Sequence, residues 1–147
     1  MPDIYNNIDT VLAMGGTLTS TGSPSQLTSG SIDLQFYEAA DVVATFLDID
    51  ELGSSPVGAA TATLALDHSD DGSTWTACAT ADVIGATITS NGECVSTTTD
   101  FTTIHVGYRM TKRYIRCRLI ATALTNGGVA VVNVLKGRKR HGANQTV

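Results

Sequence analysis

The chain has no long apolar run and few aromatic residues. No stretch approaches the roughly 18 consecutive apolar residues of a membrane-spanning helix, so no membrane partner is expected. Residues 1–10, MPDIYNNIDT, contain no basic residue and no apolar core, which predicts that there is no secretory signal peptide. Aromatic residues make up 5% of the chain and hydrophobic residues 42%. Because Val, Ile, Leu and Ala stay plentiful, the 147 residues are expected to fold as one domain.

Basic residues are missing from the first three quarters of the chain. Residues 1–108 contain all 14 Asp and Glu and no Lys or Arg, whereas residues 109–147 contain all 9 Lys and Arg and no acid. This division has two interpretations. Basic strands neutralise acidic strands of the same domain, or the basic part of one subunit packs against the acidic part of the next. An excess of acid makes a poor track for phosphates, so nucleic acid is not an expected partner.

Cysteine is scarce, and no motif of a metal site or an enzyme is present. Cys78, Cys94 and Cys117 are separated by 16 and 23 residues without a CxxC pair, which predicts three buried free thiols. The G-x-S-x-G, HExxH and P-loop patterns are absent. We therefore expect neither an enzyme nor a cofactor, although a Ser-His-Asp triad assembled only by the fold would leave no such pattern.

Two local features admit both a functional and a structural interpretation. Residues 67–72 have oxygen-bearing side chains and a glycine at the positions that begin a calcium-binding loop. The twelfth position of such a loop is Glu, but here it is Cys78, which favours a turn. Trp75, the only tryptophan, is expected to pack at this turn or in the core rather than to stack on a sugar. His68 and His105 are assigned to strands and not to a spaced ligand motif.

Alternation of apolar and polar residues predicts strands and no long helix. In the first of them Ile32, Leu34 and Phe36 are expected to face the core. The pattern indicates an all-β fold, an antiparallel β-sandwich resembling a jelly roll with an extended N-terminal arm, and a small barrel is the alternative. The predicted strands are 31–37, 42–49, 60–68, 75–79, 86–90, 93–97, 113–124 and 128–136.

Three Asp-Gly or Asn-Gly pairs are typical of tight turns between antiparallel strands. They are Asp71-Gly72, Asn91-Gly92 and Asn126-Gly127. A two-residue loop at the last pair would join strands 113–124 and 128–136 as a hairpin and place Leu119 opposite Val134. The sequence therefore predicts three hairpins.

Basic side chains supply the candidate contact residues. Within strand 113–124, Cys117, Leu119 and Ala121 alternate with Arg116 and Arg118, so the two arginines share the polar face. A basic run follows the last strand, where it is expected to contact an acidic neighbour. The candidate capsid or subunit contacts are Arg116, Arg118, Arg138, Lys139 and Arg140.

The chain divides into three parts by composition. The stretch 15–30 is rich in Gly, Ser and Thr, which predicts an N-terminal arm over residues 1–30. The sandwich domain is expected over 31–141, and a polar tail over 142–147.

Three stretches together resemble a family of small, β-rich structural proteins associated with the capsid of tailed bacteriophages. They are LDHSDDGSTWT (66–76), VGYRMTKRYIRCRL (106–119) and GGVAVVNVLKGRKRH (127–141). In the family's pattern a DGSTW-like hairpin precedes a GTKRYIR strand, and an Asn/Gly turn leads to a final V-A-V-L-G-R-P-R-H strand. The resemblance covers roughly residues 31–141, and Lys139 stands where that pattern usually has Pro.

The resemblance implies a head decoration (cement) protein. Such a protein is made in the cytoplasm of the bacterial host, binds the outer surface of the capsid and stabilises adjoining subunits of the major capsid protein. A homotrimer is the implied assembly. The alternatives are a head–tail or tail-associated structural protein and a glycan-binding module of the virion surface.

Overall fold

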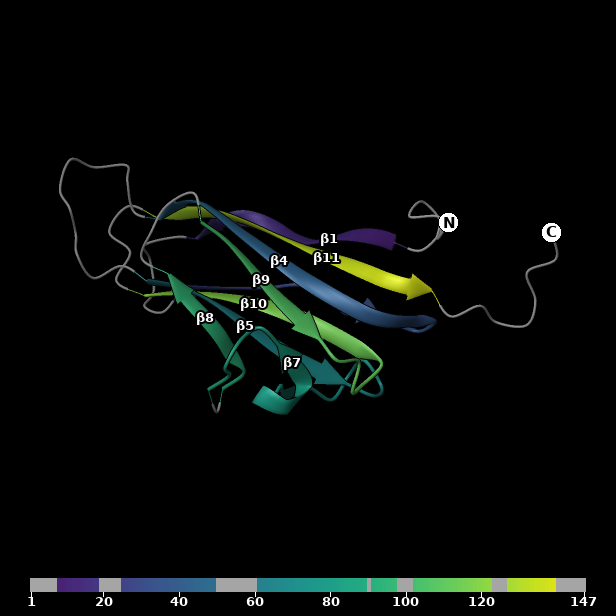
Figure 1. Cartoon of the computed structure of the whole chain (residues 1–147). Helices are drawn as coiled ribbons and strands as arrows, with labels where there is room; N and C mark the ends of the chain where they lie inside the picture. The colour runs from purple at the N-terminus through teal and green to yellow at the C-terminus, as the bar shows by residue number, and fades with distance from the viewer. Residues whose placement is uncertain are drawn as a thin grey trace.

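The computed structural model describes residues 8–18, 25–49, 61–89, 91–97, 102–122 and 127–139. Two antiparallel sheets pack face to face, with β1, β11 and β4 in one layer and β10, β5 and β8 in the other (Figure 1). The strands are β1 (Ile8–Leu18), β2 (Ser25–Thr28), β3 (Ile32–Asp33), β4 (Tyr37–Ile49), β5 (Thr61–Ser69), β6 (Thr76–Ala77), β7 (Val83–Ile84), β8 (Glu93–Thr97), β9 (Thr102–Tyr108), β10 (Tyr114–Thr122) and β11 (Gly128–Lys139). A single 3₁₀ turn, η1 (Thr80–Asp82), is the helical element of the described residues, none of which belong to a helix long and apolar enough to cross a membrane.

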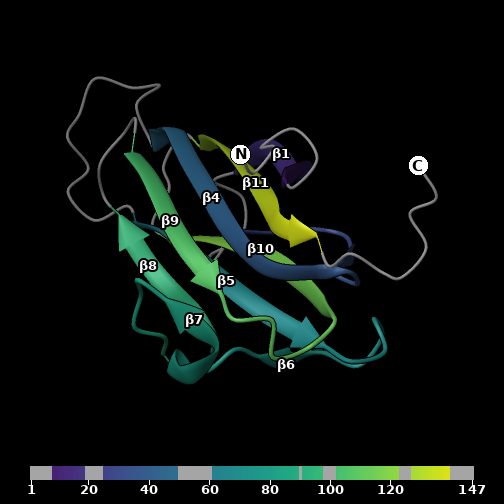
Figure 2. The ribbon, with the colours of Figure 1, turned by 45° about the vertical axis from the view of Figure 1, so that its right-hand side comes forward.

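The eight longer strands follow the jelly-roll topology. They form four antiparallel strand pairs (couples), which are β1 with β11, β2 with β10, β4 with β9 and β5 with β8. Pairing of β11 with β4 and of β10 with β5 then joins the couples into the sheets β1-β11-β4-β9 and β2-β10-β5-β8. The short β7 extends the first sheet beyond β9, and β6 pairs with the end of β5 (Figure 2). The short β3 pairs with β10. The predicted antiparallel, jelly-roll-like sandwich is confirmed.

Alternate side chains from both sheets fill the space between the layers. On β10, Cys117, Leu119 and Ala121 are buried, as predicted, while Arg116 and Arg118 point to the outer face. The opposing layer contributes the buried residues Val42, Ala44 and Phe46 of β4 and Ala130, Val132 and Val134 of β11. The period of two thus places the core as the sequence indicates.

The hairpin predicted at Asn126-Gly127 is wrong. Leu119 pairs with Leu27 of β2 and Leu64 of β5, not with Val134, because β10 and β11 belong to different sheets. Asn126 lies outside the described residues. Gly127 has φ +107°, and a Cβ added there would lie 2.8 Å from the carbonyl oxygen of Leu18. This glycine therefore permits β11 to begin close beside β1.

The other two turns form, but only one joins two strands. At Asp71-Gly72, β5 and β6 pair with His68 opposite Thr76, so this hairpin is confirmed. At Asn91-Gly92 the amide of Gly92 donates to the carbonyl of Thr89 at 3.1 Å. The strand predicted for 86–90 does not form over its described residues, and β8 pairs with β5 instead.

The first predicted strand is shorter than expected. Ile32 and Leu34 are buried as predicted, but Phe36 is 57% exposed and has φ +74°. A residue with a left-handed backbone conformation cannot continue the pleat of a strand, so the side chain of Phe36 turns away from the core. The strand β4 then begins at Tyr37, five residues before the predicted start at 42.

The described residues of the N-terminal arm contribute a strand to each sheet. Residues 8–18 form β1 along β11, and residues 25–28 form β2 along β10. The tail 142–147 lies outside the described residues. The division into arm, domain and tail stays a prediction.

Candidate functional site

Arg116 and Arg118 both bind the carboxylate of Asp67, which lies on the neighbouring strand β5. Arg118 donates from Nε to Oδ2 and from Nη2 to Oδ1, each at 2.9 Å, and Arg116 donates from Nε to Oδ2 at 2.9 Å. The Asp67 side chain is 6% exposed, against 30% for Arg116 and 16% for Arg118. Arg118 Nη2 also donates to the carbonyl of Asn91 at 2.6 Å. At this place a basic strand neutralises an acidic neighbour of the same domain.

The guanidinium of Arg116 also covers the indole of Trp75, with 4.7 Å from Cζ to the ring centroid. Trp75 is half-buried. The indole therefore packs at the turn, as predicted, and one of its faces is taken by a cation.

The predicted contact residues are not all described. Arg116 and Arg118 lie together on the outer face of β10, as predicted, but both are engaged inside the protomer. Arg138 and Lys139 end β11, and their side chains and the whole of Arg140 lie outside the described part of the chain. A contact of these five residues with another subunit stays a prediction.

The loop that resembles a calcium site is a turn held by one carboxylate. Asp71 accepts the amides of Ser73 at 2.8 Å and Thr74 at 2.7 Å, and the hydroxyls of Ser69 at 2.8 Å and Thr74 at 3.0 Å. These donors hold the pKa of Asp71 well below its usual range. Over the described ranges, no group of three or more His, Cys, Asp or Glu is arranged to hold a metal.

The buried titratable groups serve packing. All three cysteines are free and buried, as predicted, and burial raises the pKa of Cys94 to about 12. His68 Nδ1 lies 3.1 Å from the hydroxyl of Tyr108 and 3.2 Å from that of Thr111, and burial lowers the pKa of this histidine. The Tyr108 hydroxyl in turn accepts the amide of Lys112 at 2.9 Å. This network ties the loop between β9 and β10 to β5.

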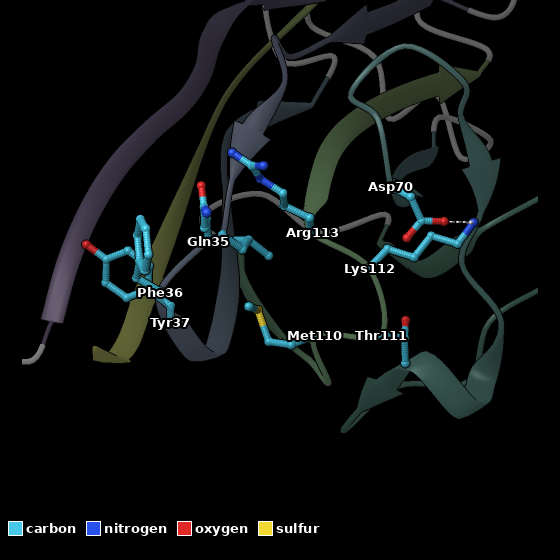
Figure 3. A pocket seen from close by; sticks show the side chains of 9 residues that line it. Gln35, Phe36, Tyr37, Asp70, Met110, Thr111, Lys112 and Arg113 are labelled. Atoms are coloured by element: carbon cyan, nitrogen blue, oxygen red, sulfur yellow. Dashed lines mark ion pairs between the residues drawn. The ribbon is translucent and has the colours of Figure 1, made fainter. Parts of the chain in front are cut away.

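A hollow of about 310 Å³ opens at one end of the sandwich (Figure 3). The turn of residues 34–37 forms one wall, residues 110–113 form another, and Asp70 lies at the rim. Phe36 and Met110, one from each wall, are the two non-glycine residues with positive φ among the described residues, at +74° and +58°. The alternation had assigned Phe36 to the core, and no signal in the sequence marked this hollow.

Each cation at the hollow has an acidic partner. Lys112 Nζ lies 3.6 Å from a carboxylate oxygen of Asp70. Arg113 donates from Nε and Nη2 to the two carboxylate oxygens of Asp33, at 2.9 and 2.6 Å. This guanidinium holds the pKa of Asp33 below its usual value. The surroundings of the hollow are therefore close to neutral.

The outer face of the first sheet carries several aliphatic side chains among polar ones. Leu12 of β1 is 64% exposed, and Asn133 lies between it and Val43 of β4 in the register. We define the apolar face by five of its aliphatic residues, which are Leu12, Val43, Val129, Val131 and Leu135. A sheet face in water normally carries polar side chains at such positions.

Comparison with known proteins identifies a similar fold but no family. No protein-family model and no curated protein matches the chain. Among solved structures, the PBSX exported protein XepA is similar, with 16% identity and a TM-score of 0.56. The match covers 95% of this chain and 41% of that one. This chain therefore has the fold of a part, less than half, of that protein.

Proposed function

We propose that this protein is a structural component of a phage virion, which binds the outer surface of the capsid and stabilises adjoining subunits of the major capsid protein. The observation that carries the proposal is the apolar face. The jelly-roll topology supports the proposal, because this fold recurs in the domains of viral capsid proteins. The fold shared with the PBSX exported protein XepA supports a role in the virion.

The apolar face favours contact with another protein. Leu12 is 64% exposed, and the cost of its hydration is removed when a partner covers it. Burial of one exposed Leu or Val side chain contributes about 1.5–3 kcal/mol. Of the five residues, Leu12 and Val129 are exposed and Val43, Val131 and Leu135 are half-buried. Aliphatic side chains gathered on one face of three neighbouring strands are more typical of interaction surfaces than of surfaces in water.

The basic run lies at the end of β11, a strand that also contributes residues to the apolar face. Val129, Val131 and Leu135 of the apolar face precede Arg138, Lys139 and Arg140 in β11 and directly after it. One exposed ion pair contributes about 0–1 kcal/mol, but a homotrimer would repeat each contact three times on one lattice. We propose that this basic run meets acidic surface on the shell or on a sister subunit.

Binding to purified capsids that lack the protein tests the role of the apolar face. Leu12→Asp is expected to weaken binding about tenfold or more, because a charge replaces an apolar contact. Ile84→Asp, at a residue that is 55% exposed on the edge strand β7, is the matched control and should bind as the wild type does. Equal binding of the two variants at unchanged thermal stability would contradict the proposal.

Salt dependence tests the basic run separately. Replacing Arg138, Lys139 and Arg140 together with Ser should lower occupancy at low salt and flatten its decline as salt rises. The isolated protein should unfold as the wild type does. An occupancy that matches the wild type at every salt concentration would exclude electrostatic docking by these residues.

Labelling on intact virions separates the proposal from a head–tail role. A decoration protein should be found over the whole shell. A signal restricted to one vertex or to the tail would assign the protein to the head–tail junction or the tail instead.

A further inference from the structure

We propose that the hollow between residues 34–37 and 110–113 is a binding site for a neutral carbohydrate. The site shares no residue with the apolar face, so the inference is independent of capsid binding. Figure 3 shows Phe36 and Tyr37 on one side, the Asp70–Lys112 pair on the other, and Met110 between them. A volume of about 310 Å³ lies at the lower end of the usual range for pockets that take small molecules.

Two apolar residues of the hollow have a strained backbone conformation that other residue types adopt more easily. Phe36 and Met110 have φ of +74° and +58°, a region that turns normally fill with Gly or Asn. Strain of this kind collects at functional sites. The two residues lie 74 positions apart in the sequence, yet both line this hollow. Their strain therefore marks one place on the surface.

Phe36 has the exposure of a stacking platform. It is 57% exposed although it is aromatic, and the amide of Tyr37 closes the turn beneath it by donating to the carbonyl of Leu34 at 3.0 Å. Leu34 is fully buried and anchors the turn to the core. A sugar ring packs the apolar C–H groups of one face on such an aromatic side chain.

The polar groups match hydroxyls better than they match an ion. Lys112 and Arg113 each have a carboxylate partner, so neither an anion nor a cation finds an uncompensated charge here. The rim supplies donors from Lys112 and Arg113, acceptors from Asp70, and both from the amide of Gln35. Hydroxyl groups donate and accept at the same time. A neutral sugar therefore suits both the aromatic wall and the rim.

Saturation-transfer NMR with a panel of neutral mono- and disaccharides tests the site. The wild type should transfer saturation to ring protons of at least one sugar. Phe36→Gly should reduce its affinity about tenfold or more. The thermal midpoint of this variant should stay equal or rise, because glycine accepts a positive φ without strain. Ile84→Gly, at another exposed apolar residue, should leave sugar binding unchanged.

Two further variants keep the test decisive. Phe36→Leu keeps apolar bulk without the ring, so it should also lose binding even if the glycine variant fails to fold. Asp70→Ala should weaken binding because it removes acceptors at the rim. Absence of transfer to every sugar in the panel, full binding by both Phe36 variants, or binding of apolar peptides in place of sugars would overturn the inference.

Discussion

The guanidinium of Arg118 holds the buried carboxylate of Asp67 through two parallel hydrogen bonds of 2.9 Å. The same carboxylate accepts a third bond from Arg116. Because Asp67 is almost completely buried, its charge depends on these partners for compensation. The two arginines that the sequence offers as contacts to another subunit thus have a structural task inside this one.

Removal of each arginine should have an unequal effect on stability. Arg118→Ala is expected to lower the free energy of unfolding by about 3 kcal/mol, because it removes the bidentate partner of a buried charge. Arg116→Ala should cost only about 1 kcal/mol, since Arg118 keeps both of its bonds. Urea denaturation followed by circular dichroism measures both values. Equal losses would show that the pairing with Arg118 is not the stronger one.

Gly127 and Gly85 should respond differently to an added methyl group. Both have positive φ, but a Cβ at Gly85 meets no atom within 4 Å, whereas one at Gly127 would lie 2.8 Å from the carbonyl oxygen of Leu18. Gly85→Ala should cost about 1 kcal/mol through strain alone. Gly127→Ala should cost roughly 3 kcal/mol, because β11 must also move away from β1. Thermal unfolding of both variants measures the difference, and similar midpoints would show that this close approach is easily relieved.

The stability of the protein should fall in mild acid through His68. Burial, which outweighs the nearby Asp82 carboxylate, lowers the pKa of this histidine from 6.5. The unfolded chain therefore takes up the proton at a higher pH than the folded protein does. The contribution is fully present above about pH 6.5 and is lost as the pH falls through the lowered pKa.

Denaturation at several pH values measures this effect. His68→Gln should flatten the decline of the unfolding free energy between about pH 7 and about pH 5. A decline that is as steep in the variant as in the wild type would assign the acid sensitivity to other groups.

The three thiols should react only after unfolding. Burial raises the pKa of Cys94 to about 12 and shifts those of Cys78 and Cys117 in the same direction. Little thiolate is then present near neutral pH, and the sulfurs are covered. Titration with dithionitrobenzoate should detect almost no thiol in the folded protein and three in denaturant. Rapid reaction of one thiol in the folded state would show that a path to the core opens.

The sequence by itself determined the class of fold and, in most of the predicted strands, the side that is buried, although Phe36 was assigned to the core and is exposed. Cys117, Leu119 and Ala121 alternate along β10 with Arg116, Arg118 and Ile120. Because successive side chains of a strand point to opposite sides, only one of these two sets enters the core. The same rule identified β4 and β5, and the Asp-Gly pair predicted the hairpin of β5 and β6. These features are local, so a few consecutive residues specify them.

Only the tertiary structure decided which strands are partners. Leu119 lies between Leu27 and Leu64 rather than beside Val134, because the jelly roll pairs distant parts of the chain and sends β10 and β11 to opposite sheets. Alternation specifies a face but not a neighbour. The same holds for the candidate sites. Phe36 and Met110 line one hollow, and Asp67 binds Arg118, only because long-range pairing brings together segments that no spacing in the sequence connects.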